Sequence, residues 1–124
     1  MKYLLLVFYD ENVRNSLSEP ESQALIQEAI DFDNGLRESG HLIAAHPLEG
    51  VHTATTLRMR SGKVAFTDGP FAETNEQIGG FLLIEARDLN EAIQIASRVP
   101  PARLGGIEVR PIIDMSQAPQ IRPR

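Results

Sequence analysis

The segment TDGPFAETNEQIGGF, residues 67–81, decides the fold prediction because it separates two apolar segments that are typical of strands. A simple reversal between strands needs about two to five residues. The sequence therefore predicts a longer loop here than the connection requires. Binding and catalytic groups concentrate on such loops, so we look for function close to this segment.

The residues before this segment predict a strand, a helix and a second strand. Residues 2–9 are continuously apolar, as in a strand buried on most of both faces. Ser18 and Glu21 have the spacing of a capping box, and Gly40 stands where a helix of this length would end. Residues 41–45 then predict a short extended segment.

A hairpin, a strand, a helix and a last strand complete the prediction. Residues 53–60 and 63–66 flank the turn signal Ser61-Gly62. Residues 80–85 predict the next strand. Asp88 is the expected N-cap of a second helix. Its buried face would comprise Leu89, Ala92, Ile93 and Ala96 and could extend to Val99. Residues 107–113 predict the final strand.

This order predicts an α+β ferredoxin-like sandwich, βαββαβ with an inserted hairpin. We expect a single domain over residues 1–113 and a loose C-terminal tail over residues 114–124. Two helices on one side of a sheet leave its other face open. A second copy of the chain is the usual cover for such a face, so we expect a homodimer.

Composition excludes several classes of protein. The chain has 124 residues and a net charge of −5. Its basic residues are scattered, which argues against a nucleic-acid surface. No apolar run is long enough to span a bilayer, and the chain has no cysteine for a disulfide or a thiolate site. We expect a cytoplasmic protein that binds neither nucleic acid nor membrane.

Asp68 is the first candidate for chemistry, and its motif has two interpretations. Asp68-Gly69-Pro70 can be a turn and nothing more, because Asp, Gly and Pro each favour turn conformations. Alternatively, the turn holds the Asp68 carboxylate rigidly at the rim of a pocket, where it acts as a base or binds a polar group. Both interpretations stay open at this point.

Other candidates surround Asp68. Glu73 could share its proton chemistry, and His46 is the histidine best placed to exchange a proton with a carboxylate. Arg58 could orient an anionic substrate, and Phe71 and Tyr9 complete the predicted substrate-binding residues. The loop lacks the ligand spacing of a calcium site, and Gly79-Gly80 lacks the spacing of a dinucleotide fingerprint. We therefore predict no metal and no cofactor.

The motif Asp68-Gly69-Pro70-Phe71, with its continuation through residues 76–81, resembles the signature of the DGPF-domain proteins, a branch of the YCII-related superfamily. The opening strand and residues 107–111 also look typical of that family. The resemblance implies a ferredoxin-like fold that dimerises into an α/β-barrel-like assembly. It also implies a cleft near the motif loop and a His/Asp pair, for which Asp68 would be the carboxylate. The first predicted helix has no histidine where related proteins place one.

Two functions follow as competing hypotheses. The first is a cofactor-independent enzyme that abstracts a proton from a small molecule and completes an elimination or isomerisation, with Asp68 as base and Glu73 or His46 as its partner. The second is a non-catalytic ligand-binding or regulatory module. The resemblance supports the second through family members encoded beside extracytoplasmic-function sigma factors, which makes a sigma factor its expected partner.

Overall fold

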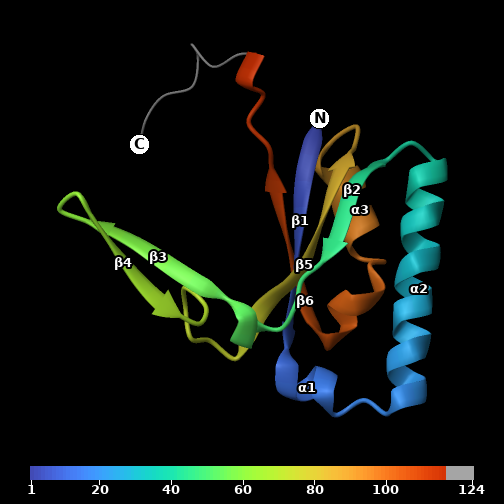
Figure 1. Ribbon diagram of the computed structural model, residues 1–124. Helices are drawn as coiled ribbons and strands as arrows, with labels where there is room; N and C mark the ends of the chain where they lie inside the picture. Colours follow the sequence, from blue (N-terminus) through green and yellow to red (C-terminus); the bar gives the residue numbers. More distant parts are fainter. Residues whose placement is uncertain (117–124) are drawn as a thin grey trace.

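The computed structural model describes residues 1–116, which form an α+β domain whose main sheet has four antiparallel strands (Figure 1). The strand order is β2-β5-β1-β6. The strands are β1 (Lys2–Asp10), β2 (Leu42–Pro47), β5 (Glu76–Glu85) and β6 (Gly105–Pro111). Residues 117–124 of the predicted tail lie outside the described residues.

Helices link these strands in the order that the sequence predicts. The α-helices are α1 (Glu11–Asn15), α2 (Glu19–Glu38) and α3 (Leu89–Ala96), and the short 3-10 helices are η1 (Val51–Thr53) and η2 (Pro100–Leu104). The succession β1-α2-β2-β5-α3-β6, with every neighbouring strand antiparallel, is compatible with the ferredoxin-like fold. The α+β prediction is therefore confirmed.

Local signals place the ends of both long helices. The Ser18 hydroxyl accepts a hydrogen bond from the Glu21 amide, and the Glu21 carboxylate accepts one from the Ser18 amide. Gly40 follows the helix with a φ of 83°, a conformation that favours glycine. Asp88 caps α3 by accepting from the Glu91 amide. All of these boundaries follow the predicted capping residues.

The prediction of a long loop is wrong, because much of that segment forms strands. Strand β4 (Lys63–Asp68) continues to Asp68 and β5 begins at Glu76, so residues 69–75 alone form the connection. Glu76 to Ile78 pair with the end of β1, and Gly79 lies at a bulge where the register shifts. The start of this strand could not be predicted from the local sequence, which is rich in turn-forming residues. Pairing with β1, and not local propensity, keeps these residues extended. Residues 11–15, whose polar sequence is typical of a loop, form the short helix α1.

Strands β3 (Thr55–Arg60) and β4 form a separate two-stranded sheet, which we call the arm. The arm projects away from the four-stranded sheet (Figure 1). Ser61 and Gly62 both have positive φ, at 51° and 75°. A two-residue hairpin turn needs such values because its backbone twist must match the right-handed twist of the strands that it joins. The predicted hairpin is confirmed.

The core lies between the helices and one face of the main sheet. Alternate residues of β1, among them Tyr3, Leu5 and Val7, are buried there with α3 side chains such as Ile95. Ala92, Ala96 and Val99 are buried as predicted, whereas Leu89 and Ile93 are exposed, which corrects that part of the predicted face. Ile95 of α3 is buried in their place. On the opposite side of the sheet, which we call the open face, no helix of residues 1–116 packs.

Candidate functional site

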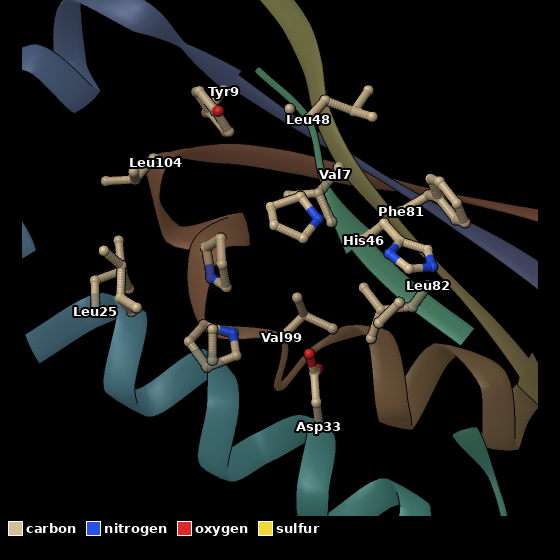
Figure 2. A pocket seen from close by; sticks show the side chains of 18 of the residues that line it. Val7, Tyr9, Leu25, Asp33, His46, Leu48, Phe81, Leu82, Val99 and Leu104 are labelled. Atoms are coloured by element: carbon tan, nitrogen blue, oxygen red, sulfur yellow. The ribbon is translucent and has the colours of Figure 1, made fainter. Parts of the chain in front are cut away.

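A cleft of about 250 Å³ separates α2 from the helix-facing side of the main sheet (Figure 2). We call it the α2 cleft. Its walls are apolar residues of α2, β1, β2, β5 and the segment around η2, including Val7, Leu25, Ala29, Ala45, Leu82, Val99, Pro100 and Leu104. Its size approaches the lower end of the range for small-molecule sites.

The cleft exists because α2 is fully packed near its C-terminal end and much less so before it. Leu36 is buried, whereas Ile26 and Ile30, on the same apolar stripe, keep 44% and 47% of their surface exposed. A stripe of this kind normally buries itself against a sheet. Here its N-terminal part lines open space, which leaves apolar surface accessible to a small molecule.

Tyr9 forms part of the cleft wall and packs against bare backbone. A Cβ atom added to Gly79 would lie 1.8 Å from Cε1 of the Tyr9 ring, so the ring occupies the space that a side chain would need. The guanidinium carbon of Arg14 lies 5.8 Å from the centroid of the same ring. Tyr9 and Arg14 therefore give this part of the cleft a hydroxyl and a cation.

Asp33 is the carboxylate of the cleft. It is half-buried, and Figure 2 shows it pointing from α2 toward the cleft interior. Burial raises the pKa of the Asp33 carboxyl, and the nearby positive charge of Arg37 opposes that rise in pKa. A carboxylate surrounded by apolar groups is energetically unfavourable.

The predicted role assignments did not include Asp33 or Arg14, although the sequence contains a signal for the first. Position 33 falls on the helical stripe formed by Ile26, Ala29, Ile30 and Leu36, where a carboxylate interrupts an otherwise apolar face. Arg14 lies on α1, a helix that the sequence does not predict. Its contact with Tyr9 depends on the tertiary structure.

Tyr9 and His46 are the two predicted site residues that the structure places at the cleft. His46 pairs with Phe81 across β2 and β5, and their ring centroids lie 5.7 Å apart. Leu82, the next residue along β5, is buried against the helices. Because side chains alternate along a strand, the rings of His46 and Phe81 lie on the open face, away from Asp33.

The other four predicted site residues belong to the arm and the turn after it. The Arg58 guanidinium carbon lies 4.1 Å from the centroid of the Phe71 ring, and Arg58 also donates to the Phe71 carbonyl. This contact brings two predicted substrate-binding residues together. Asp68 and Glu73 are exposed, and all four residues lie outside the cleft lining. Their functional roles remain predictions.

Hydrogen bonds to the backbone hold the motif turn in place. The buried Thr56 hydroxyl donates to the Gly69 carbonyl at 2.8 Å. The side-chain amide of Gln77 donates to the backbone carbonyls of Ala72 and Thr74. Gly69 has a φ of 112°, which side chains rarely adopt. These contacts give the motif an architectural role at the base of the arm.

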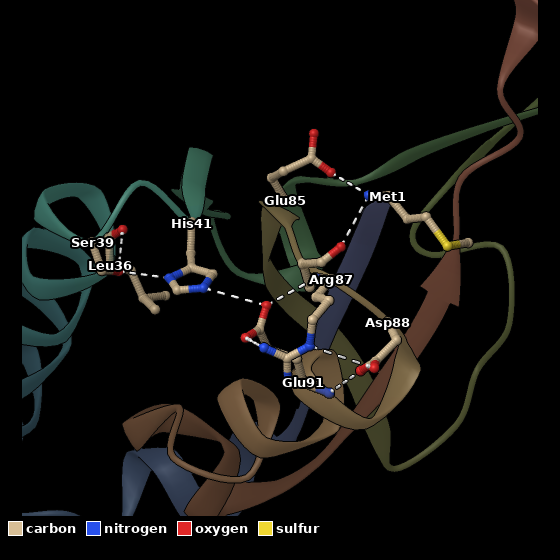
Figure 3. A network of polar contacts seen from close by, with 9 residues as sticks. Met1, Leu36, Ser39, His41, Glu85, Arg87, Asp88 and Glu91 are labelled. Atoms are coloured by element: carbon tan, nitrogen blue, oxygen red, sulfur yellow. Dashed lines mark hydrogen bonds and ion pairs between the residues drawn. The ribbon is translucent and has the colours of Figure 1, made fainter.

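A Ser-His-Glu sequence of contacts joins the end of α2 to the start of α3 (Figure 3). Nδ1 of His41 lies 2.7 Å from the Ser39 hydroxyl, and Nε2 lies 3.4 Å from the Glu91 carboxylate. The Ser39 hydroxyl already donates its proton to the Leu36 carbonyl. It therefore accepts from His41, which is the opposite of what an activated serine nucleophile requires. We interpret the cluster as a structural junction between two helix caps.

Residues 1–116 hold neither a metal-ligand cluster nor a helix that could span a membrane. No three His, Asp or Glu side chains in this part of the chain approach closely enough to hold a metal ion. No helix within the same residues has the length and apolar character needed to cross a membrane.

Comparison with known proteins identifies the family. The model of the YCII-related domain matches residues 1–116. An uncharacterised protein of Rhizobium meliloti (strain 1021) is 35% identical over 114 residues, which cover 90% of this chain and 92% of that protein. The match extends over β1, both long helices and the motif turn at the base of the arm. This chain therefore belongs to the YCII-related family.

Proposed function

We propose that the protein is a cofactor-independent enzyme that abstracts a proton from a small, largely apolar molecule bound in the α2 cleft. The observation that carries this proposal is the Asp33 carboxylate, half-buried in an otherwise apolar cleft, with its pKa raised by burial. A base is most effective when its pKa approaches the working pH. Apolar surroundings move a carboxylate in that direction.

The cleft also suggests the kind of substrate. Its walls favour an apolar body, and Arg14 lies near Tyr9, where a positive charge would stabilise a negative charge that develops on a carbonyl or carboxylate. In the proposed step, Asp33 takes a proton from a carbon beside that group. The C–H bond breaks, an O–H bond forms on Asp33, and the electron pair stays on the substrate for elimination or isomerisation.

We also propose that the protein is a homodimer formed through the open face, with a barrel-like arrangement of two sheets. Leu4, Leu6 and Phe8 of β1 lie on this face beside Phe81 and Leu83 of β5. Each is only partly covered within one chain. A contiguous apolar sheet face of this kind normally marks an interaction surface.

Deuterium incorporation offers a direct test of proton abstraction. A library of small apolar ketones and carboxylic acids is screened for binding by ligand-observed NMR. Each compound that binds is then incubated with the protein in D₂O. We expect deuterium to enter the carbon beside the carbonyl or carboxylate, and we expect Asp33→Asn to reduce the rate at least a hundredfold.

Asp31→Asn is the matched control because Asp31 lies on the same helix, is exposed, and accepts a hydrogen bond from Gln27 that an asparagine can keep. We expect it to retain the wild-type exchange rate. Equal exchange rates in Asp33→Asn and wild type would contradict the catalytic proposal. Binding without exchange in the wild type would leave the cleft as a non-catalytic ligand site.

A further inference from the structure

The arm exposes an apolar stripe along one of its two faces. Leu57 pairs with Phe66 and Met59 pairs with Val64, so all four side chains lie on the same side of the hairpin. Their exposed fractions are 52%, 71%, 64% and 44%. The opposite side carries Arg58 and the buried Thr56. One face of the arm is thus built as a surface for burial and is left uncovered.

Residues 1–116 do not supply a cover for this stripe. The arm is a two-stranded sheet of its own, and such a hairpin has marginal stability when it stands alone in water. Figure 1 shows it projecting away from the four-stranded sheet. The large exposed fractions of the stripe agree with this position. A surface of this kind is expected to be buried against another molecule.

The net charge of the arm indicates which kind of molecule buries the stripe. The arm, residues 55–68, contains Arg58, Arg60 and Lys63 against one carboxylate, a net charge of +2, whereas the whole chain carries −5. The rest of the chain therefore carries −7. A positively charged arm on an acidic protein is complementary to another copy of the same protein.

The open face has the matching features at one end. Phe8, Glu76 and Glu108 border a shallow hollow there. Glu76 lies opposite Asp10 and Glu108 lies opposite Leu6, so both carboxylates are on the open face, where Glu108 also forms an ion pair with Arg110. The open face thus presents apolar side chains next to acidic ones, and the arm carries its basic side chains, Arg60 and Lys63 at the tip among them, on the side opposite its apolar stripe.

We infer that the arm of each copy packs its apolar stripe across the acidic end of the open face of a second copy. Arg60 and Lys63, on the other side of the arm tip, strengthen the contact through long-range attraction to the carboxylates of that end. This inference rests on the proposed homodimer and is independent of the chemistry in the α2 cleft. Two-fold symmetry makes the exchange reciprocal, so each copy gives one arm and receives one. Both apolar surfaces are then covered in a closed assembly.

Cross-linking between isotopically different copies tests the inference. Because the chain has no cysteine, Met59→Cys gives one attachment point on the stripe for a benzophenone maleimide. Labelled ¹⁴N and ¹⁵N chains are mixed, re-equilibrated and irradiated. We expect cross-links that join the arm of one isotope to β1, β5 or β6 of the other. Asn90→Cys, exposed on α3, is the control and should give none to the open face.

Light scattering on the wild-type protein separates the outcomes. A dimer with mixed-isotope cross-links from position 59 to the open face supports the inference. A dimer whose arm cross-links only within its own chain overturns the inference and leaves the open-face dimer standing. A monomer overturns both. None of these results bears on the exchange activity of Asp33, which is measured separately.

Charge reversal supplies an independent test of the same inference. Arg60→Glu with Lys63→Glu should weaken dimerisation at least tenfold at low salt, with a smaller effect at high salt because ions screen exposed charges. Adding Glu76→Lys and Glu108→Lys to the same chain should restore most of the loss. An unchanged dissociation constant in the first variant would contradict the predicted placement of the arm tip.

Discussion

The ring of Tyr9 occupies the space in which Gly79 would carry a side chain, with Cε1 only 1.8 Å from the position of a Cβ atom. This contact joins β1 to the bulge of β5 and forms one wall of the α2 cleft. It also accounts for the glycine, whose backbone must allow the close approach of an aromatic ring.

Gly79→Ala is therefore expected to destabilise the protein, by about 1–3 kcal/mol, because the ring or the bulge must move to accept the methyl group. Chemical denaturation measures the change. Gly106→Ala is the control, since a Cβ atom there would have open space and no strained φ. Equal free energies of unfolding for the two variants would show that Tyr9 moves aside without cost.

The raised pKa of Asp33 makes stability depend on pH in a predictable direction. The folded state holds this proton more tightly than the unfolded state, so the contribution of Asp33 to stability falls as the pH rises from the unfolded pKa through the folded pKa. We expect Asp33→Asn to be more stable than wild type at pH 7 and to lose that advantage in acid. Urea unfolding between pH 3 and pH 7 measures this difference. If Asp33→Asn raised the free energy of unfolding by the same amount at pH 3 and at pH 7, burial of the charge could not be the cause.

Glu91 should show the opposite dependence on pH. The hydrogen bond from the Arg87 amide is the main cause that lowers the pKa of the Glu91 carboxyl, with the charges of Arg87 and His41 adding to it (Figure 3). Its stabilising contribution is present above the unfolded pKa and is lost as the pH falls through the lower folded pKa. Glu91→Gln should flatten the acid part of the stability profile, measured by urea unfolding from pH 2.5 to pH 6. The exposed Glu38→Gln is the control. Parallel profiles for wild type and Glu91→Gln would exclude this contribution.

Thr56→Val tests the anchoring of the motif turn. The variant keeps the shape of the buried side chain but removes its hydrogen bond to the Gly69 carbonyl, at an expected cost of about 1–2 kcal/mol. Hydrogen exchange at residues 69–72 should accelerate. Thr55→Val, exposed on the other face of the arm, should leave these rates unchanged. Unaltered exchange in Thr56→Val would mean that other contacts hold the turn.

Capping residues account for the parts of the fold that could be predicted from sequence. Ser18, Gly40 and Asp88 act within a few residues of their own positions, so their patterns needed no tertiary information. The turn at Ser61-Gly62 is equally local. Residues 76–79 contain no such signal, because their extended conformation comes from pairing with a strand that lies far away in the sequence.

The candidate site was less predictable for the same reason. The family motif drew attention to Asp68, but the structure places that carboxylate on the arm, outside the α2 cleft. Asp33 could have been found as the charged residue on an apolar helix stripe. Its importance depends on how far α2 stands from the sheet, and that separation is a property of the assembled domain.

The sequence alone determined the order of the elements, the ends of the long helices, the hairpin turn and the family motif, because each depends on neighbouring residues. The tertiary structure decided where β5 begins, that α2 leaves a cleft, that Tyr9 meets Gly79, and that the arm projects with its apolar stripe uncovered. These features result from contacts between distant segments, whose packing energy outweighs local preference.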